Sequence, residues 1–354
     1  MKRADSVIVI SILVVAVILL GEVLVYVSSP YSHETELIED EAGGYSLNIS
    51  SSYATDYTVI TSETEANANE RHLFIYRDMA YPSMLDHDAI DTWIDRMKAE
   101  LEVAGFTSYT VVDADALQYI MDASSESGKA TNTSVLIFTG ILPDTVYGIN
   151  VSILEDWLAA GGFLYWTGGT FAKYVGHSDG SVDFMEADPG SRFLGVPWSI
   201  NDRDDTIVGN SPSEDRGIGE AMNIYYAQCN YGVSSDVGDA LFLGLVSDDG
   251  YNSISLCKYA GGSGQIAIFG GKFPPDVKDT AYSNIVKVIM SGLCYDSRVT
   301  LLEDSSKGPG SINLEIPVSS DRCTLVYVLF GGMIGTYSHL WRVDADVSSP
   351  GARH

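Results

Sequence analysis

Carboxylates gather in one short segment of the sequence, where their spacing could serve a cation. Asp202, Asp204 and Asp205 follow one another closely after Asn201. Hard cations such as Ca²⁺ take several carboxylate oxygens from a flexible turn. The segment lacks the Gly and the distal Glu of an EF-hand. We therefore expect no cofactor, and Ca²⁺ at these aspartates is the alternative.

The six histidines form no metal-binding motif, because none has the H-E-x-x-H spacing or any other paired spacing. His177, Asp179 and Asp183 form a looser group, for which a divalent-ion site and a plain loop are both open. Asp86, His87 and Asp88 precede an expected helix, where acidic side chains interact favourably with the helix N-terminus.

Common nucleophile and phosphate-binding motifs are also absent. The chain has no G-x-S-x-G sequence, and Trp166–Gly169 lacks the spacing and the Lys of a P-loop. The spacings between Cys229, Cys257, Cys294 and Cys323 are 28, 37 and 29 residues, which excludes a compact zinc knuckle. In an exported chain four cysteines are expected to pair, and free buried thiols are the alternative.

Residues 7–27 form an almost unbroken apolar run. At about 1.5 Å per residue, a helix of this length matches a hydrocarbon core of about 30 Å. Lys2 and Arg3 predict a cytoplasmic tip of residues 1–6 and place the rest of the chain outside the cell. A cleaved signal peptide is the alternative, but bulky residues 23–27 occupy the place where cleavage would fall. We therefore expect a single-pass membrane protein.

The charge of the chain is strongly acidic, with 20 Lys and Arg against 48 Asp and Glu, or −28. This balance argues against binding to nucleic acid or to anionic lipid head groups, which both require clustered Lys and Arg. The charges within residues 1–27 cancel, so the whole excess belongs to the exported part, where it favours solvation. Three glycosylation sequons, at Asn48, Asn132 and Asn150, are consistent with export.

Strands and helices alternate over residues 71–297. The expected strands are 72–76, 107–112, 135–140, 163–167, 240–246, 253–259 and 265–271, and the expected helices are 88–104, 114–123, 153–160 and 280–293. Continuous apolar strands that alternate with helices predict an α/β fold of the flavodoxin or Rossmann type, in which helices cover both faces of a parallel sheet. Residues 170–235 interrupt this pattern with Gly, Asp, Ser and Asn, and we interpret them as an insertion of loops and short strands.

The segments on either side of this domain differ in texture. Residues 28–70 are rich in Ser, Thr, Glu and Tyr, which favours an extracellular stalk with at most a short strand at 57–61. Residues 298–354 alternate like strands and predict a small β-unit. A second membrane span over residues 323–341 is the alternative for part of that unit.

Two glycine-rich segments carry a resemblance to a known family. These are VLIFTG–loop–helix–AAGGFLYWTGG, residues 135–169, and GGSGQIAIFGG with the helix after it, residues 261–293. The chain resembles the class I glutamine amidotransferase-like superfamily, particularly its divergent trehalose-utilisation-type members, over residues 71–295. That superfamily places a Cys on the turn after the fourth strand and a His after the late strand. Here those places read Thr167-Gly168-Gly169 and Gly270-Gly271, so the resemblance implies the fold without the amidotransferase chemistry.

Ligands of open parallel sheets bind beyond the carboxyl ends of the strands. The candidate pocket residues are therefore Asp78, Gly140, Thr167, Gly168 and Gly270. We expect a non-catalytic surface protein that binds a glycan, a protein partner or a second copy of itself. The alternative is an extracellular hydrolase or sugar-active enzyme with a rearranged site, in which Asp78 and a carboxylate of the insertion do acid–base work.

Overall fold

The structure is a computed structural model, and it describes the strands and helices of the chain from residue 33 to residue 344. The described ranges are 33–39, 44–51, 55–64, 71–103, 106–185, 187–207, 211–222, 224, 229–270, 278–306, 310–316, 323–331 and 337–344. The predicted cytoplasmic tip and membrane anchor, residues 1–27, lie outside them. Over the ranges given, no helix is both long enough and apolar enough to cross a membrane.

The chain divides into two compact units, one of residues 1–56 and 305–315 and the other of residues 57–304 and 316–354. The larger unit contains a seven-stranded, mostly parallel sheet in the order β14-β17-β18-β8-β6-β4-β5. Its parallel strands are β4 (His72–Tyr76), β5 (Tyr109–Val112), β6 (Thr133–Ile137), β8 (Phe163–Trp166) and β18 (Gln265–Phe269). In chain order these five strands lie as 2-1-3-4-5. Two antiparallel strands, β17 (Ile254–Lys258) and β14 (Ala240–Phe242), extend the sheet beyond β18.

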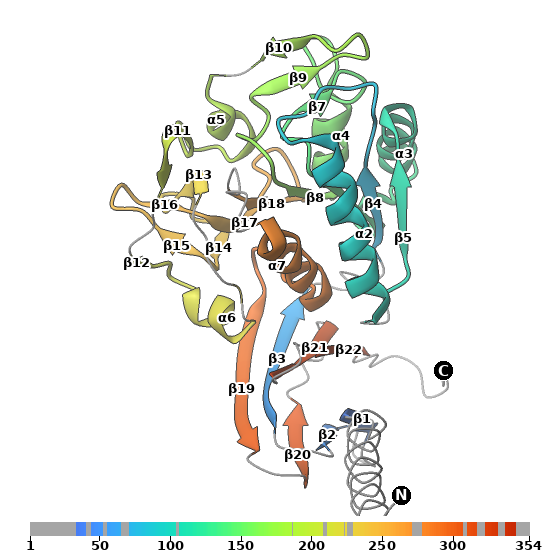
Figure 1. Ribbon diagram of the computed structural model, residues 1–354, viewed down its shortest axis with the longest axis vertical. Helices are drawn as coiled ribbons and strands as arrows, with labels where there is room; N and C mark the ends of the chain where they lie inside the picture. Colours follow the sequence, from blue (N-terminus) through green and yellow to red (C-terminus); the bar gives the residue numbers. More distant parts are fainter. Residues whose placement is uncertain are drawn as a thin grey trace, which may run out of the picture. The chain divides into compact units, whose positions relative to one another are not determined.

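Helices cover both faces of this sheet (Figure 1). Helices α2 (His87–Val103) and α7 (Lys278–Ser291) lie against each other on one face, and α3 (Ala114–Glu126) and α4 (Ile153–Ala159) lie against each other on the opposite face. The strands alternate accordingly: Leu136 and Tyr165 pack with α2 and α7, whereas Ile137 and Trp166 pack with α3 and α4. The predicted mixed α/β fold with a largely parallel sheet is thus confirmed.

The expected stripe on α2 is buried as the 3.6-residue period requires, at Ile90, Ile94, Met97 and Leu101. Its last expected member, Ala104, lies outside the described residues. Helix α3 begins at its N-cap Asp113, whose side chain accepts a hydrogen bond from the Ala116 backbone N–H at 2.9 Å.

The expected insertion, residues 170–235, forms two short helices and contributes strands to two small sheets, which also contain strands from outside these bounds. One sheet joins β7 (Leu142–Pro143), β9 (Tyr174–Gly176) and β10 (Val182–Phe184). The other joins β11 (Ile200–Ile207), β12 (Ser211–Pro212), β13 (Cys229–Ser234), β15 (Leu245–Val246) and β16 (Tyr251–Asn252). The helices are α5 (Pro189–Phe193) and α6 (Arg216–Ala221), and a short 3-10 turn, η1 (Ala130–Asn132), precedes β6.

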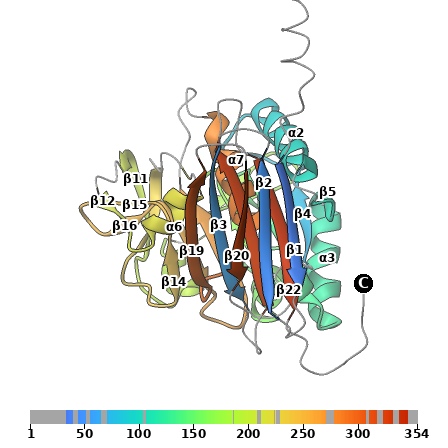
Figure 2. The same cartoon turned by 90° about the horizontal axis from the view of Figure 1, so that it is seen from below.

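The segment that we expected to be a stalk, residues 28–70, instead contributes three strands to sheets with strands from the end of the chain. These strands are β1 (His33–Glu39), β2 (Tyr45–Ser51) and β3 (Thr55–Thr64). The residues from 298 onward form β19 (Arg298–Ser306), β20 (Gly310–Ile316), β21 (Cys323–Gly331) and β22 (Tyr337–Asp344). One sheet has the order β1-β2-β20 and the other β19-β3-β21-β22, and Figure 2 shows β19 and β3 side by side.

This pairing has a physical reason. Val59, Thr61 and Ser62 of this segment are buried, and Thr, Tyr and Val all favour strands. Strand β3 lies between β19 and β21 in this sheet and pairs with both of them. The segment 323–341, for which a membrane span was the alternative, contains parts of two antiparallel strands, β21 and β22.

Candidate functional site

The five predicted pocket residues all follow the carboxyl ends of parallel strands. Asp78 comes after β4, Gly140 after β6, Thr167 and Gly168 after β8, and Gly270 after β18. They therefore share one edge of the sheet, which we call the carboxyl edge. A functional site at this edge would need space and reactive groups that a substrate can reach.

Backbone atoms fill the carboxyl edge between β6 and β8. Gly140 and Gly168 have φ values of +66° and +101°, a region that side chains disfavour. A Cβ on Gly140 would lie 2.5 Å from the Gly168 carbonyl carbon, and a Cβ on Gly168 would lie 2.2 Å from the Phe138 carbonyl oxygen. The Trp166 indole N–H donates to the Gly169 carbonyl oxygen at 2.6 Å and fixes the same turn. The two turns are in contact, with no room for a ligand between them.

The polar groups of the predicted pocket are buried or bonded to backbone. The Asp78 carboxylate accepts hydrogen bonds from the backbone N–H groups of Ala80 at 2.9 Å and of Ala114 at 3.2 Å, which ties the turn after β4 to the start of α3. The Gly270 N–H donates to the Ser253 carbonyl oxygen at 2.8 Å. Within the described part of the chain, the buried Thr167 hydroxyl has no hydrogen-bond partner. The Asp78 carboxylate thus serves to hold the backbone of this turn in place.

A histidine lies between two carboxylates near this edge. His177 Nδ1 is 2.7 Å from Asp144 Oδ2, and His177 Nε2 is 3.1 Å from Asp183 Oδ2. The Tyr81 hydroxyl donates to the other Asp144 oxygen at 3.1 Å. Asp179, which the sequence grouped with His177, instead accepts from the Ser181 backbone N–H and hydroxyl. The sequence missed Asp144, because it is far from His177 along the chain.

The contacts among His177, Asp144, Asp183 and Tyr81 limit the chemistry that these side chains can perform. The hydrogen bonds to Asp144 and then Asp183 raise the pKa of His177. Partial burial and the hydrogen bond to Asp144 raise the pKa of Tyr81 to about 12. Both ring nitrogens of His177 face carboxylates, so neither faces a substrate as a general base must. The described residues contain no group of three or more His, Cys, Asp or Glu arranged to hold a metal ion.

The proposed Ca²⁺ segment lies on a strand. Asn201 pairs with Gly232 and Asp202 pairs with Tyr231 in the antiparallel β11–β13 ladder, and the register shifts between Asp202 and Ile207. We expected a flexible turn, and the structure differs there. The side chains of Asp202, Asp204 and Asp205 are not among those described, so the Ca²⁺ site stays a prediction.

The predicted disulfides are not what the structure shows for two of the four cysteines. Cys257 and Cys294 are buried, free thiols. The side chains of Cys229 and Cys323 are outside those described. Of the three sequons, Asn132 and Asn150 are exposed, and Asn48 is half-buried on β2.

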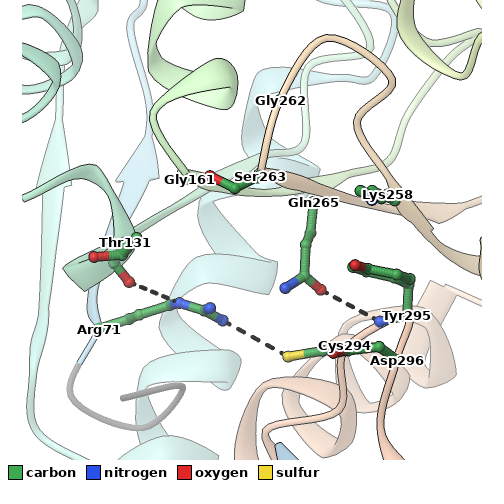
Figure 3. Close-up of a pocket in the computed structure, with 10 residues that line it drawn as sticks. All are labelled: Arg71, Thr131, Gly161, Lys258, Gly262, Ser263, Gln265, Cys294, Tyr295 and Asp296. Atoms are coloured by element: carbon green, nitrogen blue, oxygen red, sulfur yellow. Dashed lines mark hydrogen bonds between the residues drawn. The ribbon is translucent and has the colours of Figure 1, made fainter. Parts of the chain in front are cut away.

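A cavity of about 360 Å³ lies at the opposite, amino edge of the sheet (Figure 3). Its lining comes from segments just before parallel strands, from the end of antiparallel β17 and from the turn after α7. The lining residues are Arg71, Thr131, Gly161, Lys258, Gly262, Ser263, Gln265, Cys294, Tyr295 and Asp296. None of the five predicted pocket residues lines this cavity.

Glycines bring two walls of this cavity together. A Cβ on Gly264 would lie 2.1 Å from the Leu158 carbonyl oxygen, and one on Gly262 would lie 2.4 Å from the Ala159 Cα. The Ser263 N–H donates to the Ala159 carbonyl oxygen at 3.3 Å across this contact. The turn before β18 is therefore held against the end of α4, which accounts physically for much of the Gly-rich pattern in both segments that carry the family resemblance.

Arg71 is the fixed cation of the cavity. Its Nε donates to the Thr131 carbonyl oxygen at 3.0 Å, and its Nη1 lies 3.9 Å from Cys294 Sγ. The guanidinium carbon lies 4.9 Å from the centre of the Phe163 ring, a cation–π contact. The second cation, Lys258, lies 3.8 Å from Asp239 and 5.8 Å from the centre of the Tyr295 ring.

Gln265 contributes an oriented amide. Its Oε1 accepts a hydrogen bond from the Tyr295 backbone N–H at 3.3 Å, which fixes which end of the amide is oxygen. Among the residues described, its amide nitrogen has no hydrogen-bond partner, and Figure 3 shows it pointing into the space toward Arg71. A cationic group and a free donor thus face the same space. The signal that could have found them is a polar residue at the start of an apolar strand, Arg71 before HLFIY and Gln265 in QIAIF.

Comparison with known proteins adds no identification: no protein-family model matches the chain, and no curated protein matches it. The amidotransferase-like resemblance therefore stays a prediction.

Proposed function

We propose that this chain is a single-pass membrane protein whose extracellular α/β domain is non-catalytic and serves recognition of a small molecule or glycan at the cell surface. The membrane anchor at residues 7–27 and the acidic composition support this location. The cavity at the amino edge is the recognition site that we assign to it.

The proposal also covers the family to which the fold belongs. The 2-1-3-4-5 order of the parallel strands is the flavodoxin-like order, and we propose that the domain is a divergent, catalytically degenerate relative of the class I glutamine amidotransferase-like superfamily. The turns after β8 and β18, where that superfamily carries its Cys and His, carry Thr167 and Gly270 here. Neither residue can replace the thiolate–imidazole pair.

One observation supports the non-catalytic assignment: in the described part of the carboxyl edge, Asp78 is already bonded to backbone and His177 to two carboxylates. Asp78 accepts two backbone N–H groups, and His177 contacts a carboxylate through each ring nitrogen. An acid–base catalyst needs a group that faces the substrate. Among the described residues, a cavity lies at the other edge, where an arginine and a primary amide face it.

Two experiments on the full-length chain test this proposal. Protease added outside intact cells should remove the part of the chain beyond residue 27, which checks the orientation. The detergent-solubilised protein, applied to a glycan array with and without Ca²⁺, should retain glycans without cleaving them. A Ca²⁺-dependent signal would support the predicted site at Asp202, Asp204 and Asp205.

The competing hypothesis of a rearranged hydrolase makes the opposite prediction. Chromogenic esters and glycosides should then be turned over, and Asp144→Asn or His177→Gln should abolish that turnover. Such a result would overturn the recognition proposal, because those residues lie at the carboxyl edge and not in the cavity.

A further inference from the structure

The cavity at the amino edge holds a pair of donors whose chemistry selects a ligand class. We propose that it binds the carboxylate group of a small organic acid, held between the Arg71 guanidinium and the Gln265 amide nitrogen. This inference rests on the proposed function, because it names the ligand chemistry of the recognition site. The supporting observations come from several segments of the larger unit.

Arg71 is held in place before any ligand arrives. The Thr131 carbonyl, the Phe163 ring and the Cys294 sulfur together contact Nε, the planar face and Nη1 of the guanidinium. A guanidinium has five N–H donors in a rigid fork, so donors remain for a ligand. A fork that is already fixed loses little side-chain entropy on binding, and its planar geometry matches a carboxylate.

Gln265 supplies a second donor with a fixed direction. Its oxygen is held by the Tyr295 N–H, so the amide nitrogen presents N–H groups to the space that Arg71 borders. Lys258 adds a positive charge to the lining, where it lies beside Asp239 and the Tyr295 ring. An anion is the ligand that satisfies a guanidinium, an amide donor and an ammonium at once.

The surroundings decide between a carboxylate and a phosphate. The chain has a net charge of −28, and Asp296 is part of the cavity lining. Helices α4 and α7 end near this edge with their carbonyl groups, the negative end of each helix dipole. The charges of Arg71 and Lys258 are balanced by Asp296 in the lining and by Asp239 beside Lys258, so the negative helix ends and the acidic chain decide the field. The repulsion that remains is about twice as large for a dianion as for a monoanion. A carboxylate on a small, otherwise neutral frame fits both the donors and the field.

The test compares two sugars that share a ring and differ in the anionic group, glucuronate and glucose. Titration of the detergent-solubilised full-length protein by calorimetry, at fixed ionic strength, should show binding of glucuronate at least about tenfold tighter than that of glucose. Acetate should compete with glucuronate, and inorganic phosphate at neutral pH should compete more weakly than acetate.

The decisive variant is Gln265→Glu. It keeps an oxygen for the Tyr295 N–H and replaces the free amide donor with a second oxygen, so the carboxylate should lose at least about tenfold in affinity. Gln118→Glu on α3 is the matched control, because it adds the same charge outside the cavity lining and should leave the affinity nearly unchanged. Arg71→Lys, which keeps the charge and loses the fork, should also weaken glucuronate binding.

Three results would overturn the carboxylate assignment: equal affinity for glucose and glucuronate, phosphate binding tighter than acetate, or equal effects of the Gln265 and Gln118 variants. If any of these occurs while the glycan array retains neutral glycans, the recognition function stands and only the ligand class fails. Turnover that depends on Asp144 or His177 would instead remove the recognition function itself.

Discussion

Replacing Gly140 with alanine should destabilise the α/β domain far more than the same replacement at Gly128. Both glycines have nearly the same backbone conformation, with φ values of +66° and +68°. They differ in what surrounds them: a Cβ at Gly140 would meet the Gly168 backbone at 2.5 Å, and a Cβ at Gly128 meets nothing within 4 Å. The pair therefore separates backbone strain from steric overlap.

The expected magnitudes follow from these two contributions. An alanine at positive φ costs roughly 1–2 kcal/mol, and both variants carry this cost. Overlap with a well-packed backbone adds about 1–3 kcal/mol for Gly140→Ala alone, because the turns after β6 and β8 have to move apart. Each kcal/mol lowers the melting midpoint by roughly 2–4 °C in a domain of 150–250 residues.

Urea unfolding followed by tryptophan fluorescence is a suitable assay, because Trp166 donates to Gly169 in the turn that Gly140 contacts. The prediction is a free energy of unfolding about 1–3 kcal/mol lower for Gly140→Ala than for Gly128→Ala. Equal losses would refute the reasoning. They would mean that the carboxyl edge has space between β6 and β8, and the hypothesis of an enzyme site at that edge would regain support.

Three further variants test the electrostatics and the capping of the same domain. Burial lowers the pKa of Lys287 to about 8 from its ordinary 10.5, so the unfolded chain binds more protons between these values, and wild-type stability relative to Lys287→Met should rise from pH 8 to pH 10 in urea titrations. The hydrogen bonds to Asp144 and then Asp183 raise the pKa of His177, so the deficit in melting midpoint of His177→Gln should be full below pH 6.5 and disappear as pH rises through the raised value. Asp113→Ala should cost about 1 kcal/mol in urea unfolding by removing the N-cap of α3, and more than the control Asp115→Ala, which removes a first-turn charge alone.

The regular part of the fold could be predicted because its periodicity is unambiguous. The stripe from Ile90 to Leu101 has one geometrical solution, a helix with one buried face, and the continuous apolar strands require cover on both faces. The strands within residues 28–70, in contrast, could not be predicted. Ser and Thr are common both in linkers and in half-buried strands, so composition alone could not distinguish a stalk from β1, β2 and β3.

The candidate site was harder to predict, for a different reason. Parallel topology places Asp78, Gly140 and Gly168 at one edge, as predicted from the sequence. It could not foresee that the turns there touch, because the 2.5 Å approach of Gly140 to Gly168 depends on the separation of two strands. Nor could it pair Asp144 with His177, which are joined only through the β7–β9 sheet.

The direction of the helices explains why side chains must make a binding site at the amino edge. In strand–helix–strand units the helix N-termini, with their free N–H groups, face the carboxyl edge, where anions bind to backbone in many folds. At the amino edge the turns meet helix C-termini instead. The N–H groups of Gly162 and Ser263 donate to the carbonyl oxygens of Trp157 and Ala159 on α4, so they are already used. Any anion held there depends on side-chain donors. Truncation of Arg71 or Gln265 should therefore weaken binding of the carboxylate at least about tenfold, because the N–H groups of Gly162 and Ser263 are not available to replace the lost donor.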